Sequence, residues 1–381
     1  MMAAFLWRSR PGTLCRGVLP WLLTLFGLLA PWPAVWAQSV AFINPGRSDE
    51  TYWTSVSVVM RDAARSLGMA LEIHYAERDH LRPLEIAREI AERPRAQRPD
   101  FVVFTNDYSV APGVLRTLET AGIHSFMAFS GVPASLRNQT GLPRERYRYW
   151  LGSLEPRAED AGYLTAKALI VAARASRKGM GHDGRLHMLA IAGDRSTPSS
   201  VDRNAGMRRA VAEAGDVVLS QEVYGEWRRD RAAQQARVLF QRYPEVRLVW
   251  AGNDEMAFGA MDAWRERGGV PGSDAFFSGI NSSPAAMAAR RSGEISALAG
   301  GHQLAGAWSL VLLYDYAHGQ DFASEGLELV RPMFALLDAS LIERYEQKIG
   351  TRQTALDFRR YSKVHNPRLT RYTFELERLL R

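Results

Sequence analysis

The chain has 381 residues, of which 46% are hydrophobic and 23% charged, and its formal net charge is +7. This length and apolar content are enough for two hydrophobic cores. The single cysteine, Cys15, excludes an intrachain disulfide. The small basic excess contains no long cationic run, which argues against a nucleic-acid-binding function.

The first 37 residues have the layout of a secretory signal peptide. Three arginines precede an apolar run at 18–30, and Ala37 would occupy the −1 position of a cleavage site. The alternative, a membrane anchor, is disfavoured because the run is shorter than the roughly 20 residues that span a bilayer. We therefore expect export and cleavage after Ala37. The remaining chain would hold 45 basic and 41 acidic residues, a net charge of +4.

Short apolar runs then alternate with helix-like stretches. The expected strands are 40–43, 70–75, 101–104, 125–129, 186–191, 217–223, 246–250 and 275–280. The expected helices are 52–67, one opened by Pro83, 112–121, 158–175, 204–214, 231–243 and 255–267. Uniformly apolar strands separated by helices indicate parallel sheets that are covered on both faces. Eight strands are already too many for one compact layer, so the pattern predicts an α/β chain of two doubly wound domains. The Pro- and Gly-rich segment 131–149 is the expected first passage between them.

Ligands of open parallel sheets bind beyond the carboxyl ends of the strands. The loops expected there carry amide, carboxylate and imidazole side chains with aromatic rings nearby: Asn44, Tyr52, Trp53, Asp107, Trp227, Asn253, Asn281 and His302. Such a set suits a neutral polyhydroxylated ligand, because amides and carboxylates bind hydroxyls and a ring covers an apolar sugar face. Structural roles remain open for each residue. Asn and Asp often cap helices or form turns, Asp254 directly precedes a helix, and Trp53 fits a place between helices.

Several of these loops resemble the type I periplasmic binding proteins of the ribose-binding class. The resemblance rests on Asn253–Ala260, Pro271–Asp274, Ser278–Ile280, Arg203–Met207, Ser296–Ala299 and Leu313–Tyr316. It implies two α/β lobes, joined by three crossings, that close on a small ligand. The lobes would comprise 38–130 plus 301–331 and 131–300 plus 332–349, followed by a basic extension at 350–381. The core also resembles the lactose-repressor relatives, but those begin with a helix-turn-helix where this chain has a signal-like segment.

The resemblance places the ligand-binding residues on Asn44, Tyr52 or Trp53, Asp107, Trp227, Asn253 and Asn281, whereas His302 is a candidate from the loop pattern alone. Three departures change the polar groups of the expected site: Asn281 replaces an Asp, Gly300 a Gln, and Val201 an Arg. Ribose and galactose, as ligands of the family, therefore cannot be assigned to this chain. We expect a sugar-like solute or another small polyol. The family implies a monomeric periplasmic receptor without cofactor or metal that serves an inner-membrane ABC importer, or alternatively a membrane sensor.

The sequence offers little support for an enzyme. Gly179–Gly184 matches G-x-G-x-x-G, but it precedes a strand and does not link a strand to a helix as a dinucleotide site requires. We therefore predict a loop there. The chain contains no Walker A loop, no H-E-x-x-H and no G-x-S-x-G elbow. Asp107 and Asp254 leave open a paired-carboxylate site, so an exported glycoside hydrolase is the alternative of another class.

The C-terminal tail is basic. Residues 352–381 hold eight Lys or Arg and three acidic residues. The tail is either a docking segment for an acidic partner or lipid surface, or an extension that packs on the second lobe through Phe358, Tyr372, Phe374 and Leu376.

Overall fold

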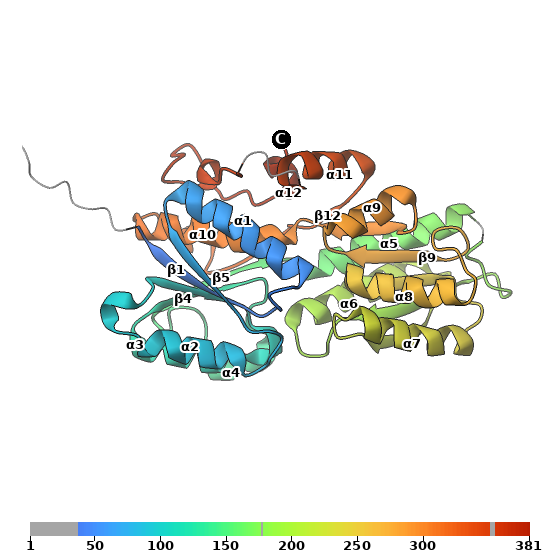
Figure 1. Cartoon of the computed structure of the whole chain (residues 1–381), viewed down its shortest axis with the longest axis horizontal. Helices are drawn as coiled ribbons and strands as arrows, with labels where there is room; N and C mark the ends of the chain where they lie inside the picture. The colour runs from blue at the N-terminus through green and yellow to red at the C-terminus, as the bar shows by residue number, and fades with distance from the viewer. Residues whose placement is uncertain (1–36, 177, 351–354) are drawn as a thin grey trace, which may run out of the picture. The chain divides into compact units, whose positions relative to one another are not determined.

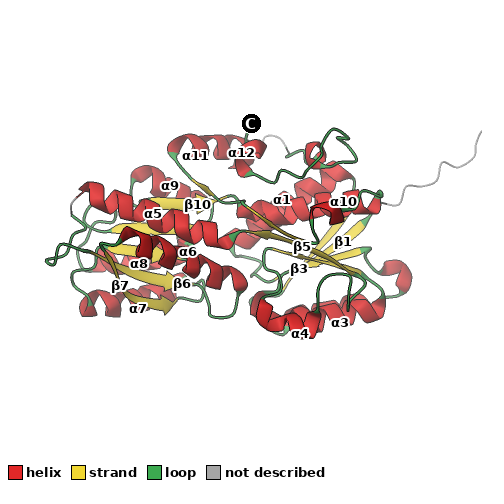
Figure 2. Ribbon diagram, turned by 180° about the vertical axis from the view of Figure 1, so that it is seen from behind, coloured by secondary structure: helices red, strands yellow, loops and turns green. Residues whose placement is uncertain are grey.

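The computed structural model describes residues 37–176, 178–350 and 355–381. Apart from Ala37, the expected signal peptide lies outside these residues. The described chain forms two six-stranded sheets, each flanked by helices (Figures 1 and 2). Within the described ranges, no helix is long and apolar enough to cross a membrane.

The first sheet is entirely parallel and has the strand order β11-β5-β4-β3-β1-β2. Its strands are β1 (Ser39–Asn44), β2 (Ala70–Tyr75), β3 (Phe101–Phe104), β4 (His124–Ala128), β5 (Trp150–Pro156) and β11 (Glu328–Arg331). Helices α1 (Thr51–Leu67) and α10 (Ala305–Ala317) cover one face, and α2 (Arg82–Glu92) and α3 (Ala111–Ala121) cover the other (Figure 1). All four residues of β3 are buried, as a strand covered on both faces requires.

The second sheet has the order β12-β10-β9-β8-β6-β7, with β12 antiparallel to β10. Its strands are β6 (Leu186–Ala192), β7 (Val217–Tyr224), β8 (Leu248–Ala251), β9 (Phe276–Ile280), β10 (Ala297–Gly300) and β12 (Ala335–Leu336). The helices are α5 (Ala158–Ser176), α6 (Pro198–Ala214), α7 (Arg229–Arg242), α8 (Asp254–Glu266) and α9 (Pro284–Ser292). Successive residues of β6 alternate between two cores: Met188 joins the core under α5 and α6, whereas Leu189 joins the core under α7 and α8.

The two-lobed doubly wound fold is confirmed, but the expected boundary at residue 131 needs correction. Segment 131–149 contains only a 3-10 turn and the short α4 (Arg137–Thr140), and β5 then returns to the first sheet beside β4. The chain first passes to the second sheet after Pro156. It crosses again between Gly300 and Ala305 and a third time between Arg331 and Ala335. Gly179–Gly184 forms a loop before β6, as expected.

The C-terminal tail packs on the first lobe, and not on the second as expected. The backbone N–H of Phe358 donates to Ser66 Oγ of α1 over 3.1 Å, and the Phe374 ring stacks on Trp308 of α10 at 5.3 Å. Buried Asp315 of α10 accepts hydrogen bonds from the Lys363 backbone N–H at 2.6 Å and the Tyr372 hydroxyl at 2.8 Å. The helix α11 (Ala339–Tyr345) precedes the tail, and the short helix α12 (Leu376–Leu379) lies near its end.

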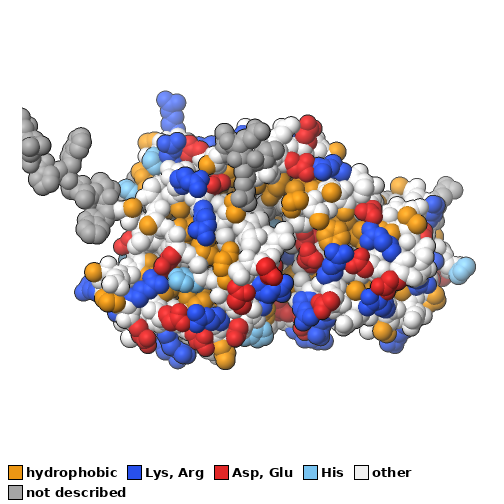
Figure 3. Space-filling view, in the orientation of Figure 1, with side chains coloured by type: hydrophobic (Ala, Val, Ile, Leu, Met, Phe, Trp, Pro, Cys, Tyr) orange, Lys and Arg blue, Asp and Glu red, His pale blue; other side chains and the backbone are white. Residues whose placement is uncertain are grey.

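The surface carries charges of both signs. Figure 3 shows basic and acidic side chains intermixed over the face that it draws. Within the tail, Arg359 pairs with Asp357 at 2.7 Å and Arg378 with Glu375 at 2.9 Å. Part of the basic excess of the tail is therefore compensated by its own carboxylates.

Candidate functional site

A cavity lies between the two sheets at the carboxyl ends of their strands. Both sheets and the crossing segments contribute to its lining: Glu50, Tyr52, Trp53, Arg78, Asp107, Phe129, Ser130, Pro156, Ala158, Thr197, Ser199, Arg203, Trp227, Asn253, Asn281, His302 and Phe334. The volume within which the centre of a water molecule fits in this cavity is about 60 Å³. Since one water needs roughly 10–15 Å³ by this measure, there is room for about four to six waters or one small molecule.

Four helices begin at this cavity because each follows a strand that ends there. Tyr52 is in the first turn of α1, Ala158 is the first residue of α5, and Thr197 and Asn253 are the N-caps of α6 and α8. The N-terminus of a helix carries a partial positive charge and free N–H groups. The cavity wall is therefore suited to oxygen-rich ligands.

On the side of the first sheet, three charged residues form a connected group. Arg78 donates to Glu50 through Nη2 at 2.5 Å and through Nε at 2.9 Å, and its Nη1 lies 4.0 Å from Asp107 Oδ2. Burial raises the pKa of Asp107 to about 6, although the Arg78 charge acts to lower it. The group thus carries an excess negative charge at neutral pH, which makes it an acceptor for hydroxyl hydrogens.

On the opposite side, Arg203 of α6 is buried between aromatic rings. Its Nη1 donates to the Gly252 carbonyl oxygen at 2.7 Å, and its guanidinium carbon lies 5.5 Å from the Trp227 ring centroid and 5.6 Å from that of Phe334. Burial lowers the pKa of Arg203 to about 10, so it remains charged at neutral pH.

His302 completes this side of the cavity. Its Nε2 lies 3.1 Å from Arg203 Nη2. Burial and the neighbouring Arg203 charge lower the pKa of His302 well below its ordinary value, so the ring is neutral. Arginine has no acceptor, hence Nε2 accepts and the proton is assigned to Nδ1. The ring stacks between Tyr52 at 4.8 Å and Phe334 at 4.4 Å.

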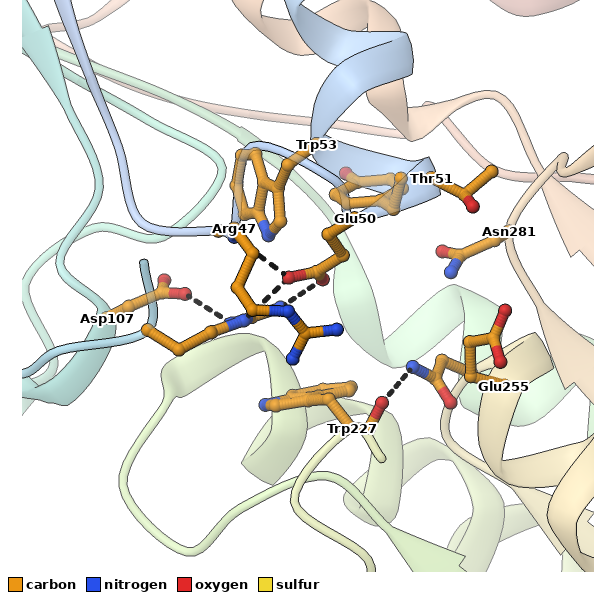
Figure 4. A network of polar contacts seen from close by, with 12 residues as sticks. Arg47, Glu50, Thr51, Trp53, Asp107, Trp227, Glu255 and Asn281 are labelled. Carbon is orange, nitrogen blue, oxygen red and sulfur yellow. Dashed lines mark hydrogen bonds and ion pairs between the residues drawn. The ribbon is translucent and has the colours of Figure 1, made fainter. Parts of the chain in front are cut away.

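Trp227 is held rigidly at the cavity. Its Nε1 donates to Asp194 Oδ2 at 2.7 Å. Gly193 permits this placement, because a Cβ there would lie 2.2 Å from the indole ring. In Figure 4 the indole lies beyond the Arg47 side chain from Glu50. An indole ring at a cavity wall is a surface on which a sugar-like ring stacks.

Seven of the eight residues expected to bind ligand line the cavity, and Asn44 does not. Asn44 is fully buried; its amide donates to Trp53 O and Ser57 Oγ, and its carbonyl oxygen accepts from the Gly46 N–H. These bonds join the end of β1 to the start of α1. Asn44 therefore positions Trp53, which does line the cavity.

Two of the lining amides already hold the protein itself together. Asn253 caps α8 by accepting from the Met256 N–H at 2.8 Å, and its amide donates to Trp227 O at 3.2 Å. Asn281 donates to Asp254 Oδ1 at 2.8 Å. The N-cap of α8 is thus Asn253, and Asp254 is the first helical residue. Asp254 is absent from the inner lining and Asp107 is part of it, which weighs against the expected pair of Asp107 and Asp254.

Sequence analysis missed Glu50, Arg78, Phe129, Arg203 and Phe334 as lining residues, although Arg203 belongs to one of the segments on which the resemblance rests. Arg78 follows β2, so its place after a strand was an available signal. Phe334 lies in the third crossing, in which no local motif marks a lining residue. Among residues 37–176, 178–350 and 355–381, no group of three or more His, Cys, Asp or Glu is arranged to hold a metal ion.

Comparisons with known proteins agree with this architecture. The model of a family described as "Periplasmic binding protein domain" matches residues 40–321. The crystal structure of a periplasmic sugar-binding protein from Pseudomonas fluorescens is 40% identical, covers 90% of this chain and 100% of its own, and has a TM-score of 0.80. A Mycobacterium smegmatis protein in complex with β-D-fucofuranose shares the fold at 18% identity, with coverage of 83% and 97% and a TM-score of 0.67.

A regulator also matches in part. The HTH-type transcriptional regulator AscG of Escherichia coli K12 is 32% identical over 87 residues, which are 22% of this chain and 26% of the regulator. The chain thus matches about a quarter of that relative. The family model spans most of the chain, and the Pseudomonas structure is similar over nearly its whole length. The chain belongs to the periplasmic binding protein family.

Proposed function

We propose that this protein is a periplasmic receptor that binds one small sugar-like solute between its lobes and presents it to an inner-membrane ABC importer. The observation that carries the proposal is the cavity at the carboxyl ends of both sheets, which combines hydroxyl-binding carboxylates with a flat indole face. The description of the 40% identical Pseudomonas relative as a periplasmic sugar-binding protein supports the same class of ligand.

The chemistry of the wall supports a polyhydroxylated ring. Asp107 and Glu50 accept hydrogen bonds from hydroxyl groups, and Trp227 stacks on the apolar face of the ring. The cavity volume fits a monosaccharide-sized solute better than an oligosaccharide. The Mycobacterium protein, which has the same fold, was crystallised with a single furanose ring.

Binding would be coupled to hinge closure. Three crossing segments join the two sheets, and both lobes contribute residues to the cavity. A ligand held from both sides favours the closed form by its difference in affinity for the two forms. We take the lobes as 38–156 plus 301–331 and 157–300 plus 332–349. We also propose that the protein is a monomer, without cofactor or metal, exported through residues 1–37 and cleaved after Ala37.

A ligand screen tests the proposal. The exported protein is unfolded thermally in the presence of monosaccharides, polyols and amino acids at saturating concentration. A ligand at about 100 times its Kd stabilises the native state by roughly 2.7 kcal/mol. We expect one sugar-like compound to raise the Tm and to be recovered chemically intact.

A matched pair of variants locates the site. Asp107→Ala removes a carboxylate from the cavity, whereas Asp62→Ala removes one from α1 that pairs with Arg65 outside the cavity. The sugar-induced shift should vanish in the first and persist in the second. A shift with amino acids alone, or no shift with any neutral or acidic sugar or any polyol, contradicts the proposal. Turnover of the ligand favours the hydrolase alternative.

A further inference from the structure

The two cations that line the cavity differ in how their charge is compensated. Arg78 contacts Glu50 directly and lies 4.0 Å from Asp107. Arg203 forms no ion pair within 4.0 Å with any described carboxylate, and its hydrogen-bond partners are a backbone carbonyl and a neutral imidazole. A buried charge without a counter-charge is costly, and an anion bound beside it removes that cost.

Three residues of the cavity wall carry buried hydrogen-bond donors without partners, and two of the three are Arg203 and its neighbour His302. Arg203 Nε, His302 Nδ1 and Trp53 Nε1 are buried and have no acceptor in the structure. Each belongs to a residue that lines the cavity. The Thr197 hydroxyl is the unpartnered group there that can also accept. Because the nitrogen atoms are almost inaccessible in this form, a ligand would reach them as the lobes shift about their hinge.

This donor excess discriminates between ligands. A sugar hydroxyl that accepts a hydrogen bond must also place its own hydrogen, whereas the unpartnered groups of Arg203 and His302 are donors only. A carboxylate accepts several hydrogen bonds and donates none, and it forms the charge-assisted pair that a guanidinium favours. The N-terminus of the 17-residue α6, at Thr197, adds a partial positive charge on this side.

We infer that the solute is an acidic monosaccharide, a uronate or aldonate, whose carboxylate is bound by Arg203 and whose hydroxyls lie toward Asp107 and Glu50. The inference rests on the proposed sugar-receptor function and adds the chemical class of the ligand. The cavity is polarised accordingly: the Glu50–Arg78–Asp107 group takes hydroxyl hydrogens, and the Arg203 side takes oxygen acceptors.

Calorimetric titration with matched ligands tests the inference. The probes are D-galacturonate against D-galactose, which differ only in the oxidation of C6, and L-arabinonate against L-arabinose, where the oxidation of C1 also opens the ring. A hydrogen-bonded charge pair raises affinity by roughly ten- to a hundredfold. We expect the acid of at least one pair to bind at least about tenfold more tightly than its neutral counterpart.

Two arginine variants of α6 assign that preference to a residue. Arg203→Gln should abolish the advantage of the acid, whereas Arg208→Gln, which removes an exposed arginine paired with Glu222, should preserve it. The ligand comparison on the unaltered protein decides the inference even if Arg203→Gln does not fold.

Neutral sugars that bind as tightly as their acids, or more tightly, overturn the inference and leave the receptor function standing. An acid preference that survives in folded Arg203→Gln also overturns it. If neither acids nor neutral sugars and polyols bind, the proposed function itself fails.

Discussion

The buried carboxyl of Asp107 makes the stability of this protein depend on pH in a defined direction. Burial raises its pKa from the ordinary 3.8 to about 6, so between these values the native state holds a proton that the unfolded chain has released. The native state then binds more protons than the unfolded state, and the free energy of unfolding falls as pH rises. Above about pH 7 the effect is complete.

The magnitude follows from the pKa difference. Each pKa unit corresponds to about 1.36 kcal/mol, so a shift of about two units costs the native state roughly 3 kcal/mol in total at high pH. About half of this cost, roughly 1.4 kcal/mol, develops between pH 5 and pH 8. Asp107→Asn replaces the carboxyl by a neutral amide of similar shape and removes the titration.

Urea unfolding followed by tryptophan fluorescence measures the effect. The free energy of unfolding of Asp107→Asn minus that of the unaltered protein should increase by about 1.4 kcal/mol from pH 5 to pH 8. Other titrating groups cancel in this difference. For Asp107→Ala, which also lacks the carboxyl, the difference in the free energy of unfolding should change with pH by the same amount. Its absolute value should differ from that of Asp107→Asn. A difference that stays constant with pH, or that decreases, refutes the reasoning.

Three further predictions concern the tail, a crossing segment and the indole. Asp315→Asn weakens the buried acceptor to which the tail is hydrogen-bonded. We expect the free energy of unfolding to fall by about 2 kcal/mol or more, and mass spectrometry to detect faster proteolysis within 355–381. Unchanged cleavage contradicts this role of Asp315. Gly301 has a φ of +108°, and the new Cβ of Gly301→Ala would lie 2.7 Å from Met333 O. We therefore expect the free energy of unfolding to fall by about 1–3 kcal/mol. Gly319→Ala, with φ +82° and open space, is its control and should cost less; equal Tm losses would contradict the steric argument. Trp227→Phe keeps an aromatic ring but loses the hydrogen bond to Asp194. If the binding free energy falls by about 1 kcal/mol, the affinity for the solute measured by calorimetry falls roughly fivefold. An unchanged affinity would show that the hydrogen bond does not position the ring.

Local patterns were enough for most elements of the fold. The run Phe101–Phe104 is apolar throughout, and it forms the fully buried β3. The approximate positions of the candidate site also followed from the sequence, because parallel strands bring the loops at their carboxyl ends to one edge. Tyr52, Asp107, Trp227 and His302 could be singled out there by their chemistry, and they line the cavity.

Other features depend on partners that are distant in the sequence. β5 belongs to the first sheet because it pairs with β4 and with β11, and β11 lies more than 170 residues further along. The tail packs on α10 because Ser362 and Tyr372 bond to Asp315, 47 and 57 residues away. No local composition specifies such pairings, since each depends on which surfaces meet when the chain folds.

The sequence by itself determined the α/β class, the alternation of strands and helices, and the loops that hold the polar and aromatic residues of the site. Those properties arise from the periodicity of apolar residues and from the geometry of parallel sheets. Only the tertiary structure decided that Arg78 is neutralised by Glu50 while Arg203 is not, and that Asn44 supports the wall without lining it. Compensation of a charge and satisfaction of a hydrogen bond depend on distances between atoms of different elements, and folding alone sets those distances.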